Sequence, residues 1–247
     1  MNVPEVVEEP MGWDALPGLF PEFPEPGRWL EMLERHAALL AAAAPRVRVT
    51  STPPGEWVRR HYAESLELLR ILLGRSRCES LADVGSGGGF PGLVIAAVRP
   101  ECEVHLVEPL RKRASLLEEI AAALGLTNVT VHAQRAEEAG RGPLRDSCAV
   151  VTARAVAPLA ELLEYTSPLA RPRGLLALAK GSAAEAELGE ATAAARALGC
   201  SFRGLVAMRP EISVNVSVAL FEKAGPTPER YPRRPGMPGK RPISGKS

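Results

Sequence analysis

Several features of a membrane or secreted protein are missing from this 247-residue sequence. No uninterrupted run of about 18 apolar residues occurs, so we expect no helix that spans a bilayer. The first residues carry neither a basic segment nor an apolar core, so we expect no secretory signal. The four cysteines stand apart without a Cys-x-x-Cys pair, which argues against a zinc site or a disulfide framework. These absences favour a cytoplasmic protein with reduced thiols and no bound metal.

The composition is that of a globular domain. Apolar residues make up 46% of the chain and charged residues 24%, and the length suits one α/β domain with an appendage. The formal net charge of +1 conceals an asymmetry. Residues 1–34 hold eight acidic residues and one basic residue, whereas residues 223–247 hold seven basic residues and one acidic residue. The basic end of the chain indicates contact with a polyanion.

The first 79 residues form a separate unit in this interpretation. Residues 1–27 are rich in proline and acidic side chains, which is typical of a loop-like arm. Apolar residues recur at helical spacing over residues 28–44 and again over residues 54–73, so we expect two helices that form a cap. A basic loop that contains Arg46 and Arg48 joins them.

From residue 80 onward, short β-branched segments alternate with segments rich in alanine and leucine. We expect strands near residues 80–84, 103–108, 128–132, 148–153, 174–180, 201–208 and 214–222. We expect helices near residues 91–98, 110–124, 158–170 and 183–198. This alternation predicts a mostly parallel sheet. The last two strands have no helix between them, so they should form an antiparallel hairpin.

The remaining residues, 224–247, are rich in Pro, Gly, Arg and Lys and show no apolar periodicity. We expect them to form an extended or flexible basic tail. The chain is thus divided into a cap (1–79), a cofactor-binding α/β domain (80–223) and this tail.

A glycine-rich loop follows the first strand of the α/β domain. It reads Asp83-Val84-Gly85-Ser86-Gly87-Gly88-Gly89-Phe90-Pro91-Gly92, and glycines at such a turn let the backbone approach a ligand closely. Glu108 ends the next strand, where a carboxylate accepts hydrogen bonds from the ribose of a nucleoside cofactor. NAD and S-adenosylmethionine both satisfy this pattern. The DxGxGxG form of the loop, the terminal hairpin and the lack of a second catalytic domain favour S-adenosylmethionine.

Several further motifs follow one another in a specific order along the chain. They are Arg48-Val49-Thr50, His61-Tyr62-Ala63-Glu64-Ser65-Leu66, the glycine loop, Arg135-Ala136-Glu137-Glu138, Thr152-Ala153-Arg154-Ala155 and Tyr231-Pro232-Arg233-Arg234-Pro235-Gly236. In this order they resemble the bacterial 16S rRNA guanine-N7 methyltransferases, the glucose-inhibited division protein B family. The resemblance runs from about residue 46 to the C-terminus. The first 30 residues depart from the family, Glu64 replaces a common Asp, and the usual Asn before the Leu-Thr of the first motif is absent.

The resemblance implies a class I, Rossmann-like methyltransferase whose seven-stranded, mostly parallel sheet ends in an antiparallel hairpin. It implies S-adenosylmethionine as the cofactor. The residues that match the family's cofactor site are Gly85, Gly87, Phe90, Glu108 (ribose), Ala136 and Glu137 (adenine), and Arg154.

Arg154 is also the expected catalytic residue, because it ends the fourth strand and faces the methyl donor. That position reads Ala153-Arg154-Ala155-Val156, without the (Asn/Asp)-Pro-Pro-(Tyr/Phe) motif of adenine amine methylation. Cys148 starts the same strand, at the wrong end to attack a cytosine. Guanine N7 has a lone pair and no proton, so its methylation needs positioning and electrostatics but no general base. We therefore assign Arg154 a positioning role.

Basic residues of the cap loop and the tail are the expected RNA contacts: Arg46, Arg48, Arg233 and Arg234, with His61 as either an RNA contact or a core histidine. By resemblance the substrate is a guanosine in the decoding-region loop of 16S rRNA, as naked rRNA or in an assembling small subunit. We expect a monomer in the cytoplasm. Three alternatives stay open: a methyltransferase of another RNA, a protein or a small molecule; an NAD-dependent oxidoreductase; and a non-catalytic RNA-binding module.

Overall fold

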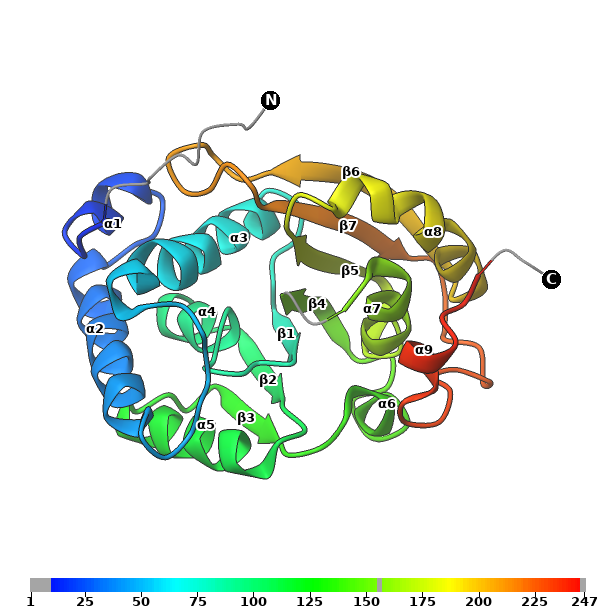
Figure 1. The fold of residues 1–247 in the computed structure, drawn as a ribbon, viewed down its shortest axis with the longest axis horizontal. Coiled ribbons are helices and arrows are strands. Elements are labelled where there is room, and N and C mark those ends of the chain that lie inside the picture. The colour runs from blue at the N-terminus through cyan, green and yellow to red at the C-terminus, as the bar shows by residue number, and fades with distance from the viewer. Residues whose placement is uncertain (1–9, 155–156, 245–247) are drawn as a thin grey trace.

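The computed structural model describes residues 10–154 and 157–244, which form a seven-stranded sheet with helices on both faces (Figure 1). The strands are β1 (Ser80–Val84), β2 (Glu103–Val107), β3 (Val129–His132), β4 (Cys148–Arg154), β5 (Ala170–Lys180), β6 (Cys200–Ala207) and β7 (Ser217–Lys223). Their spatial order is β3-β2-β1-β4-β5-β7-β6. The first five strands pair in parallel, and β7 runs antiparallel to both β5 and β6. The predicted mostly parallel sheet with a terminal antiparallel hairpin is confirmed.

Two apolar cores hold the helices on the sheet. One core contains side chains of α2 (Pro26–Ala43), α3 (Glu64–Leu73), α4 (Gly92–Val98) and α5 (Arg111–Ala123). The other contains side chains of α6 (Ala136–Ala139), α7 (Leu159–Thr166) and α8 (Ala184–Ala197). Within residues 10–154 and 157–244, no helix is both long and apolar enough to cross a membrane.

The parallel register brings the carboxyl ends of the central strands to one edge. Val84 of β1 lies opposite Val107 of β2 and Ala153 of β4. The residues that follow these positions are therefore neighbours in space although they are far apart in the sequence. Strand β4 is buried along nearly its whole length, as expected for a central parallel strand covered on both faces.

The N-terminal arm is more ordered than the sequence predicts. We expected a loop over residues 1–27, but Ala15–Leu19 form the short helix α1. Leu16, Phe20 and Phe23 are buried, and the ring of Trp13 lies 4.7 Å from that of Tyr62. The loop prediction is wrong for this part of the arm because its apolar side chains, spaced between the prolines, pack on the cap. Residues 1–9 lie outside the described residues.

The second helix of the cap is built from three pieces. A 3-10 turn, η1 (Pro54–Glu56), leads into the π-helical segment η2 (Val58–Ala63), which continues as α3. Wider turns of this kind are frequent at functional sites. The apolar spacing over residues 54–73 predicts a helix but carries no signal for the wider turn, which presents His61 toward the sheet edge.

The C-terminal tail is also folded, contrary to our expectation of an extended or flexible segment. Lys223 at the end of β7 is fully buried. Its Nζ lies 2.8 Å from Oδ1 of Asp146 and 2.6 Å from Oγ1 of Thr227, and it donates to the carbonyls of Ser167 and Ala170. A buried cation needs such partners, so this lysine anchors the start of the tail and is withdrawn from any polyanion.

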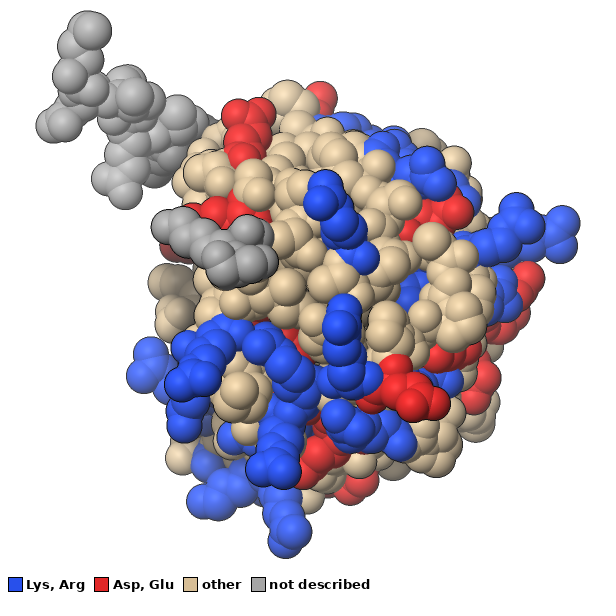
Figure 2. All heavy atoms as spheres, turned by 90° about the vertical axis from the view of Figure 1, so that its right-hand side faces the viewer, with Lys and Arg blue, Asp and Glu red and all other residues tan. Residues whose placement is uncertain are grey.

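Further along, Tyr231 is buried and the tail contains a short helix, α9 (Met237–Lys240). The Arg145 guanidinium donates to the carbonyls of Thr227 and Tyr231 at 2.8 and 2.9 Å. The composition of the tail predicts exposed charged side chains. Several charged side chains instead bind the tail to the α/β domain. The side of the molecule that carries the tail faces the viewer in Figure 2, where Lys and Arg side chains gather toward the lower left.

Asp83 fixes the turn that leaves β1. The side chain is fully buried; its Oδ2 accepts a hydrogen bond from the amide of Gly92 (3.1 Å) and its Oδ1 accepts one from the hydroxyl of Thr152 (3.3 Å). Burial raises the pKa of Asp83 to about 6, although the bond from Gly92 and the charge of Arg154 oppose that rise. The carboxyl group thus joins β1 to the start of α4 and to β4.

This pKa predicts how an Asp83→Asn variant responds to pH. An asparagine can accept from Gly92 and donate to Thr152, so the fold should persist. In the wild type the raised pKa means that folding stability falls as the pH rises from about 4 to about 6, by about 3 kcal/mol. The variant lacks this loss. Urea unfolding measures the free energy of unfolding of both proteins. Between pH 4 and pH 7 the value for the variant, relative to the wild type, should rise by about that amount. Parallel pH profiles of the two proteins would contradict the raised pKa of Asp83.

Candidate active site

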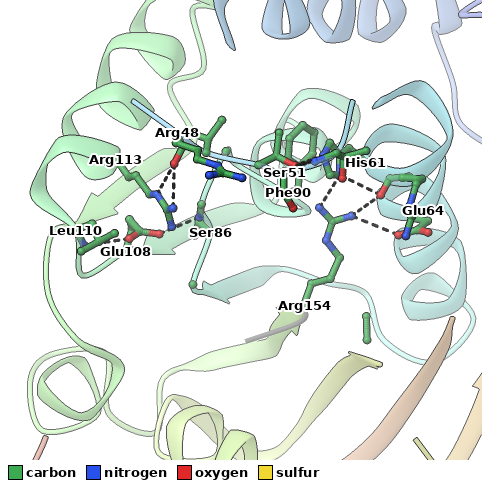
Figure 3. Close-up of a pocket in the computed structure, with 18 of the residues that line it drawn as sticks. Arg48, Ser51, His61, Glu64, Ser86, Phe90, Glu108, Leu110, Arg113 and Arg154 are labelled. Atoms are coloured by element: carbon green, nitrogen blue, oxygen red, sulfur yellow. Dashed lines mark hydrogen bonds and ion pairs between the residues drawn. The ribbon is translucent and has the colours of Figure 1, made fainter. Parts of the chain in front are cut away.

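A cavity of about 740 Å³ opens at the carboxyl ends of β1, β2, β4 and β5 (Figure 3). Ligands of open α/β sheets bind at this edge, and the volume is in the range of small-molecule sites. The cavity is lined by the glycine loop, by residues that follow β2, by the ends of β4 and β5, and by the cap. The lining residues used below are Arg48, Thr50, His61, Glu64, Gly85, Gly87, Gly88, Phe90, Glu108, Arg113, Arg154 and Lys180.

The glycine loop presents bare backbone to this cavity. Gly85, Gly87 and Gly89 have positive φ values of 75, 56 and 91°, a region that L side chains rarely adopt. A Cβ at Gly89 would also lie 2.5 Å from Cδ1 of Leu93. The chain can make this turn only with glycine at these positions, and the result is a cradle without side chains that fits the close approach of a cofactor.

Glu108 lies beside the loop with its carboxylate already oriented. The side chain is buried; Oε2 accepts from the amide of Gly87 (2.9 Å) and Oε1 accepts from the amide of Leu110 (3.0 Å). A carboxylate has about four lone-pair sites, so each oxygen retains acceptor capacity. These free sites fit the two hydroxyls of a ribose, which is the role expected from the sequence.

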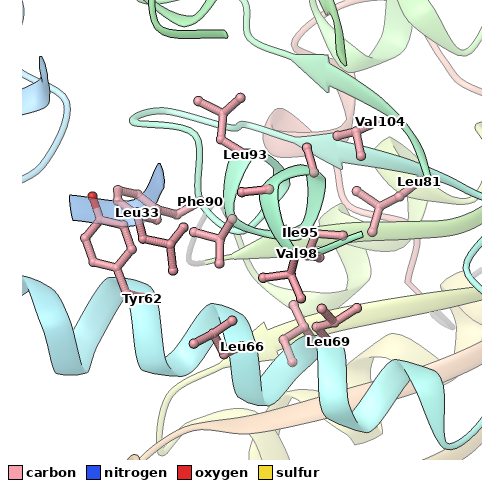
Figure 4. Packing of buried hydrophobic residues seen from close by; sticks show 14 of the residues in the cluster. Leu33, Tyr62, Leu66, Leu69, Leu81, Phe90, Leu93, Ile95, Val98 and Val104 are labelled. Carbon is pink, nitrogen blue, oxygen red and sulfur yellow. The ribbon is translucent and has the colours of Figure 1, made fainter. Parts of the chain in front are cut away.

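Phe90 links the glycine loop to the cap (Figure 4). Its ring stacks on His61 with centroids 4.7 Å apart and meets Tyr62 edge-on at 5.0 Å. The ring of His36 lies 5.1 Å away, and the Arg154 guanidinium lies 5.5 Å from the Phe90 centroid. Aromatic contacts at these distances are favourable beyond simple burial, so the loop and the cap form one rigid wall.

Arg154 points from the end of β4 toward the cap, as Figure 3 shows. Its Nη1 donates to the carbonyl of Arg60 (2.8 Å) and lies 3.5 Å from Oε2 of Glu64, and its Nη2 lies 3.1 Å from Nδ1 of His61. A guanidinium only donates, so Nδ1 of His61 accepts. The other ring nitrogen, Nε2, then carries the proton and donates to Oγ1 of Thr50 at 2.9 Å.

His61 is held neutral by its surroundings. Burial, and then the charge of Arg154, lower its pKa to about 3. Nδ1 and the carbonyl oxygen of Arg60 lie 3.1 Å apart, and both accept from the Arg154 guanidinium, which bridges them. A ring with this pKa is a weak proton acceptor at neutral pH. His61 therefore positions Arg154 and Thr50 through its two ring nitrogens.

The basic loop of the cap crosses the mouth of the cavity. At one end, Nε and Nη2 of Arg113 donate to the carbonyl of Arg48 at 3.1 and 2.9 Å. At the other end, Nε1 of Trp57 donates to the carbonyl of Thr52 at 2.8 Å. The loop is thereby fixed over the glycine loop, and the Arg48 side chain remains exposed.

The structure brings most of the expected cofactor residues together. The expected residues that line the cavity are Arg48, His61, Gly85, Gly87, Phe90, Glu108 and Arg154. Those outside the lining are Arg46, Ala136, Glu137, Arg233 and Arg234. Ala155 and Val156, which complete the motif around Arg154, lie outside the described residues.

Glu137 is engaged elsewhere. Its side chain is buried, and Oε1 accepts a hydrogen bond from the amide of Gly236 in the tail at 2.8 Å. Ala136, beside it, is buried at the start of α6. In this structure Glu137 is an anchor for the tail.

The expected RNA contacts are likewise spread apart. Arg46 is exposed, and its Nη2 lies 3.7 Å from Oε2 of Glu119. Arg233 makes a bidentate pair with the buried carboxylate of Glu164, with Nη2 2.5 Å from Oε2 and Nε 2.8 Å from Oε1. Arg234 is exposed. Arg233 therefore serves the fold, whereas Arg234 is available to a partner.

Lys180 is a cavity residue that the sequence analysis missed. It ends β5 beside the end of β4, donates from Nζ to the carbonyl of Ala157 (2.8 Å) and lies 2.9 Å from Oε2 of Glu187. The signal was present, because a lysine at the end of a predicted parallel strand falls on the ligand-binding edge. Arg154 and Lys180 thus place two cations on adjacent strands of the sheet, in addition to Arg48, Arg60 and Arg113, which line the cavity from the cap and α5.

No group of three or more His, Cys, Asp or Glu side chains is arranged to hold a metal ion in the described part of the chain. The four cysteines are free and buried.

Comparison with known proteins identifies relatives along most of the chain. Residues 30–209 match the GidB family, described as rRNA small subunit methyltransferase G. The ribosomal RNA small subunit methyltransferase G of Roseiflexus castenholzii is 43% identical over 220 residues, or 87% of this chain and 92% of that protein. The protein of the same name from Sorangium cellulosum is 42% identical over 200 residues, or 81% of this chain and 82% of that protein.

A solved structure supports the fold. A SAM dependent methyltransferase from Aquifex aeolicus matches with a TM-score of 0.53 over 76% of this chain and 98% of that chain, at 15% identity. The chain therefore belongs to the GidB family of rRNA small subunit methyltransferases, and it is an S-adenosylmethionine-dependent enzyme rather than an NAD-dependent oxidoreductase.

Proposed function

We propose that this enzyme transfers a methyl group from S-adenosylmethionine to N7 of a guanosine in the decoding-region loop of 16S rRNA. The observation that carries the proposal is a single cavity, in a member of the GidB family, that joins a glycine cradle and an oriented carboxylate to two cations at the ends of β4 and β5. The cradle and carboxylate suit the nucleoside end of the cofactor, and the cations suit an anionic or oxygen-rich target.

At the cofactor end, Gly85 and Gly87 offer backbone to the ligand, and the Glu108 carboxylate is the acceptor for the ribose hydroxyls. Phe90 closes this end against the cap. When bound, S-adenosylmethionine supplies a methyl group activated by its sulfonium charge. The protein's own contribution here is a preformed geometry, which reduces the cost of ordering the site on binding.

At the substrate end, Arg154 and Lys180 are the donors for a phosphate, a carboxylate or a guanine oxygen. Neither polar neighbour is poised as a general base: the pKa of His61 is lowered to about 3, and Glu64 lies against Arg154. A target that must lose a proton is poorly served by this site. Guanine N7 needs no proton removed, so the arrangement supports N7 as the methyl acceptor.

The RNA-facing surface in this proposal begins at the mouth of the cavity. Arg48 is exposed there and Arg113 lies beside it, so phosphates next to the target nucleotide meet positive charge. A base must leave its stack to reach a site this enclosed. We propose naked 16S rRNA or an assembling small subunit as the partner, a monomer as the acting form, and action in the cytoplasm, where that rRNA is found.

The cofactor end is tested by a Glu108→Ala variant. Loss of the carboxylate removes the ribose acceptor and leaves the Gly87 amide without a partner, so the dissociation constant for S-adenosylhomocysteine should rise about 10- to 100-fold. Isothermal titration calorimetry measures this constant, with NAD as the ligand that should not bind either protein. Unchanged affinity for S-adenosylhomocysteine would remove Glu108 from the cofactor site.

The substrate end is tested by Arg154→Ala and Arg154→Lys. We expect Arg154→Ala to lower methyl transfer to small-subunit rRNA about 100-fold, the usual effect of removing a positioned charged donor. Lysine keeps the charge without the bidentate fork, so Arg154→Lys should recover part of the rate. Transfer is measured with a labelled methyl group at saturating cofactor. Wild-type turnover in Arg154→Ala, with full cofactor affinity, would contradict the role.

A further inference from the structure

His36 joins the cap directly to the glycine loop. It lies on α2, is buried, and its Nε2 is 2.9 Å from the carbonyl oxygen of Gly88. Gly88 is one of the residues that line the cavity. No motif in the sequence singles out this histidine, and the site derived above uses only the packing of its ring on Phe90.

The direction of the hydrogen bonds around His36 follows from its partners. The Gly88 carbonyl can only accept, so Nε2 carries the proton. Nδ1 lies 3.2 Å from the hydroxyl of Tyr62 and must accept from it. Burial lowers the pKa of His36 to about 4, so the ring is neutral at physiological pH. Tyr62, His36 and Gly88 thus form a directed chain of two hydrogen bonds from η2 and α2 into the glycine loop.

The bond acts on the peptide group that joins Gly88 to Gly89, whose amide donates to the carbonyl of Ser86 at 2.7 Å. Gly88 has no side chain, and it lies between Gly87, whose amide is held by Glu108, and Gly89, whose φ is 91°. Glycine peptides turn easily because no Cβ limits them. Ser86 holds the amide end of this peptide group, and the His36 donor on the packed helix α2 holds its other end, the Gly88 carbonyl.

We propose that His36 is a positioning residue for the cofactor. By donating to Gly88 it keeps the glycine loop in the conformation that binds the nucleoside, so that packing of the cap controls cofactor affinity. The inference rests on the cofactor class and not on the identity of the RNA target. It therefore stands or falls separately from the proposed N7 specificity.

The test compares three substitutions on one helix. His36→Phe keeps an aromatic ring but has no donor, and we expect the dissociation constant for S-adenosylhomocysteine to rise about tenfold. His36→Gln retains an N–H at a similar reach, and its constant should return to within about threefold of the wild type. Leu40→Ala, at another buried position on α2, should lower the melting temperature of the free protein without a comparable loss of affinity.

These outcomes separate positioning from general destabilisation. The proposal is overturned if His36→Phe binds S-adenosylhomocysteine as the wild type does, or if Leu40→Ala weakens binding as much as His36→Phe. A measurement on the unsubstituted protein covers the case in which the phenylalanine variant does not fold. With ¹⁵N-labelled histidine, His36 should appear at pH 7 as a neutral ring protonated at Nε2; protonation at Nδ1 instead would overturn the proposal.

Discussion

The contact between Phe90 and the cap is the interaction on which the cofactor cavity depends. The glycine loop has too few side chains to define its own shape, and Phe90 is the first large side chain after the glycines at positions 87–89. His36, His61 and Tyr62 surround the ring, so α2 and η2 are fixed relative to the loop. Asp83 secures the other side of the turn from within the sheet. The parallel sheet then needs only to deliver Glu108 and Arg154 to the same edge, which its register does.

The basic side chains of this protein have two roles, which composition alone does not distinguish: some hold the tail on the domain and others remain exposed. Lys223, Arg145 and Arg233 hold the tail against the domain through Asp146, backbone carbonyls and Glu164. Arg48 and Arg234 remain exposed. Counting basic residues in the tail therefore overstates its attraction for RNA, because a buried, fully paired cation contributes little to the field outside. The cap loop, at the mouth of the cavity, has the better position for a phosphate contact.

Periodicity and loop chemistry predict the sheet, its terminal hairpin and the roles available to Gly87 and Glu108, because those features depend on local sequence and on parallel strand order. The ordered arm and tail could not be predicted in that way, since burial of Phe20 and Tyr231 depends on surfaces supplied by distant segments. The same reason explains Glu137, whose partner is Gly236, 99 positions away. The role of His36 could not be predicted, because a lone histidine on an amphipathic helix gives no local indication that its partner is the Gly88 carbonyl. Lys180 could have been found from strand ends alone.

The central claim is that this cavity directs a methyl group to a guanine nitrogen that has no proton to lose. The most direct measurement incubates the full chain with S-adenosylmethionine carrying an isotope-labelled methyl group and either naked 16S rRNA or isolated small subunits that lack the modification. The rRNA is then digested, and the labelled nucleoside is identified and located by mass spectrometry. The account predicts 7-methylguanosine in the decoding-region loop from at least one of the two substrates. Label on another nucleoside, or no transfer to either substrate by a protein that binds S-adenosylhomocysteine, would contradict it.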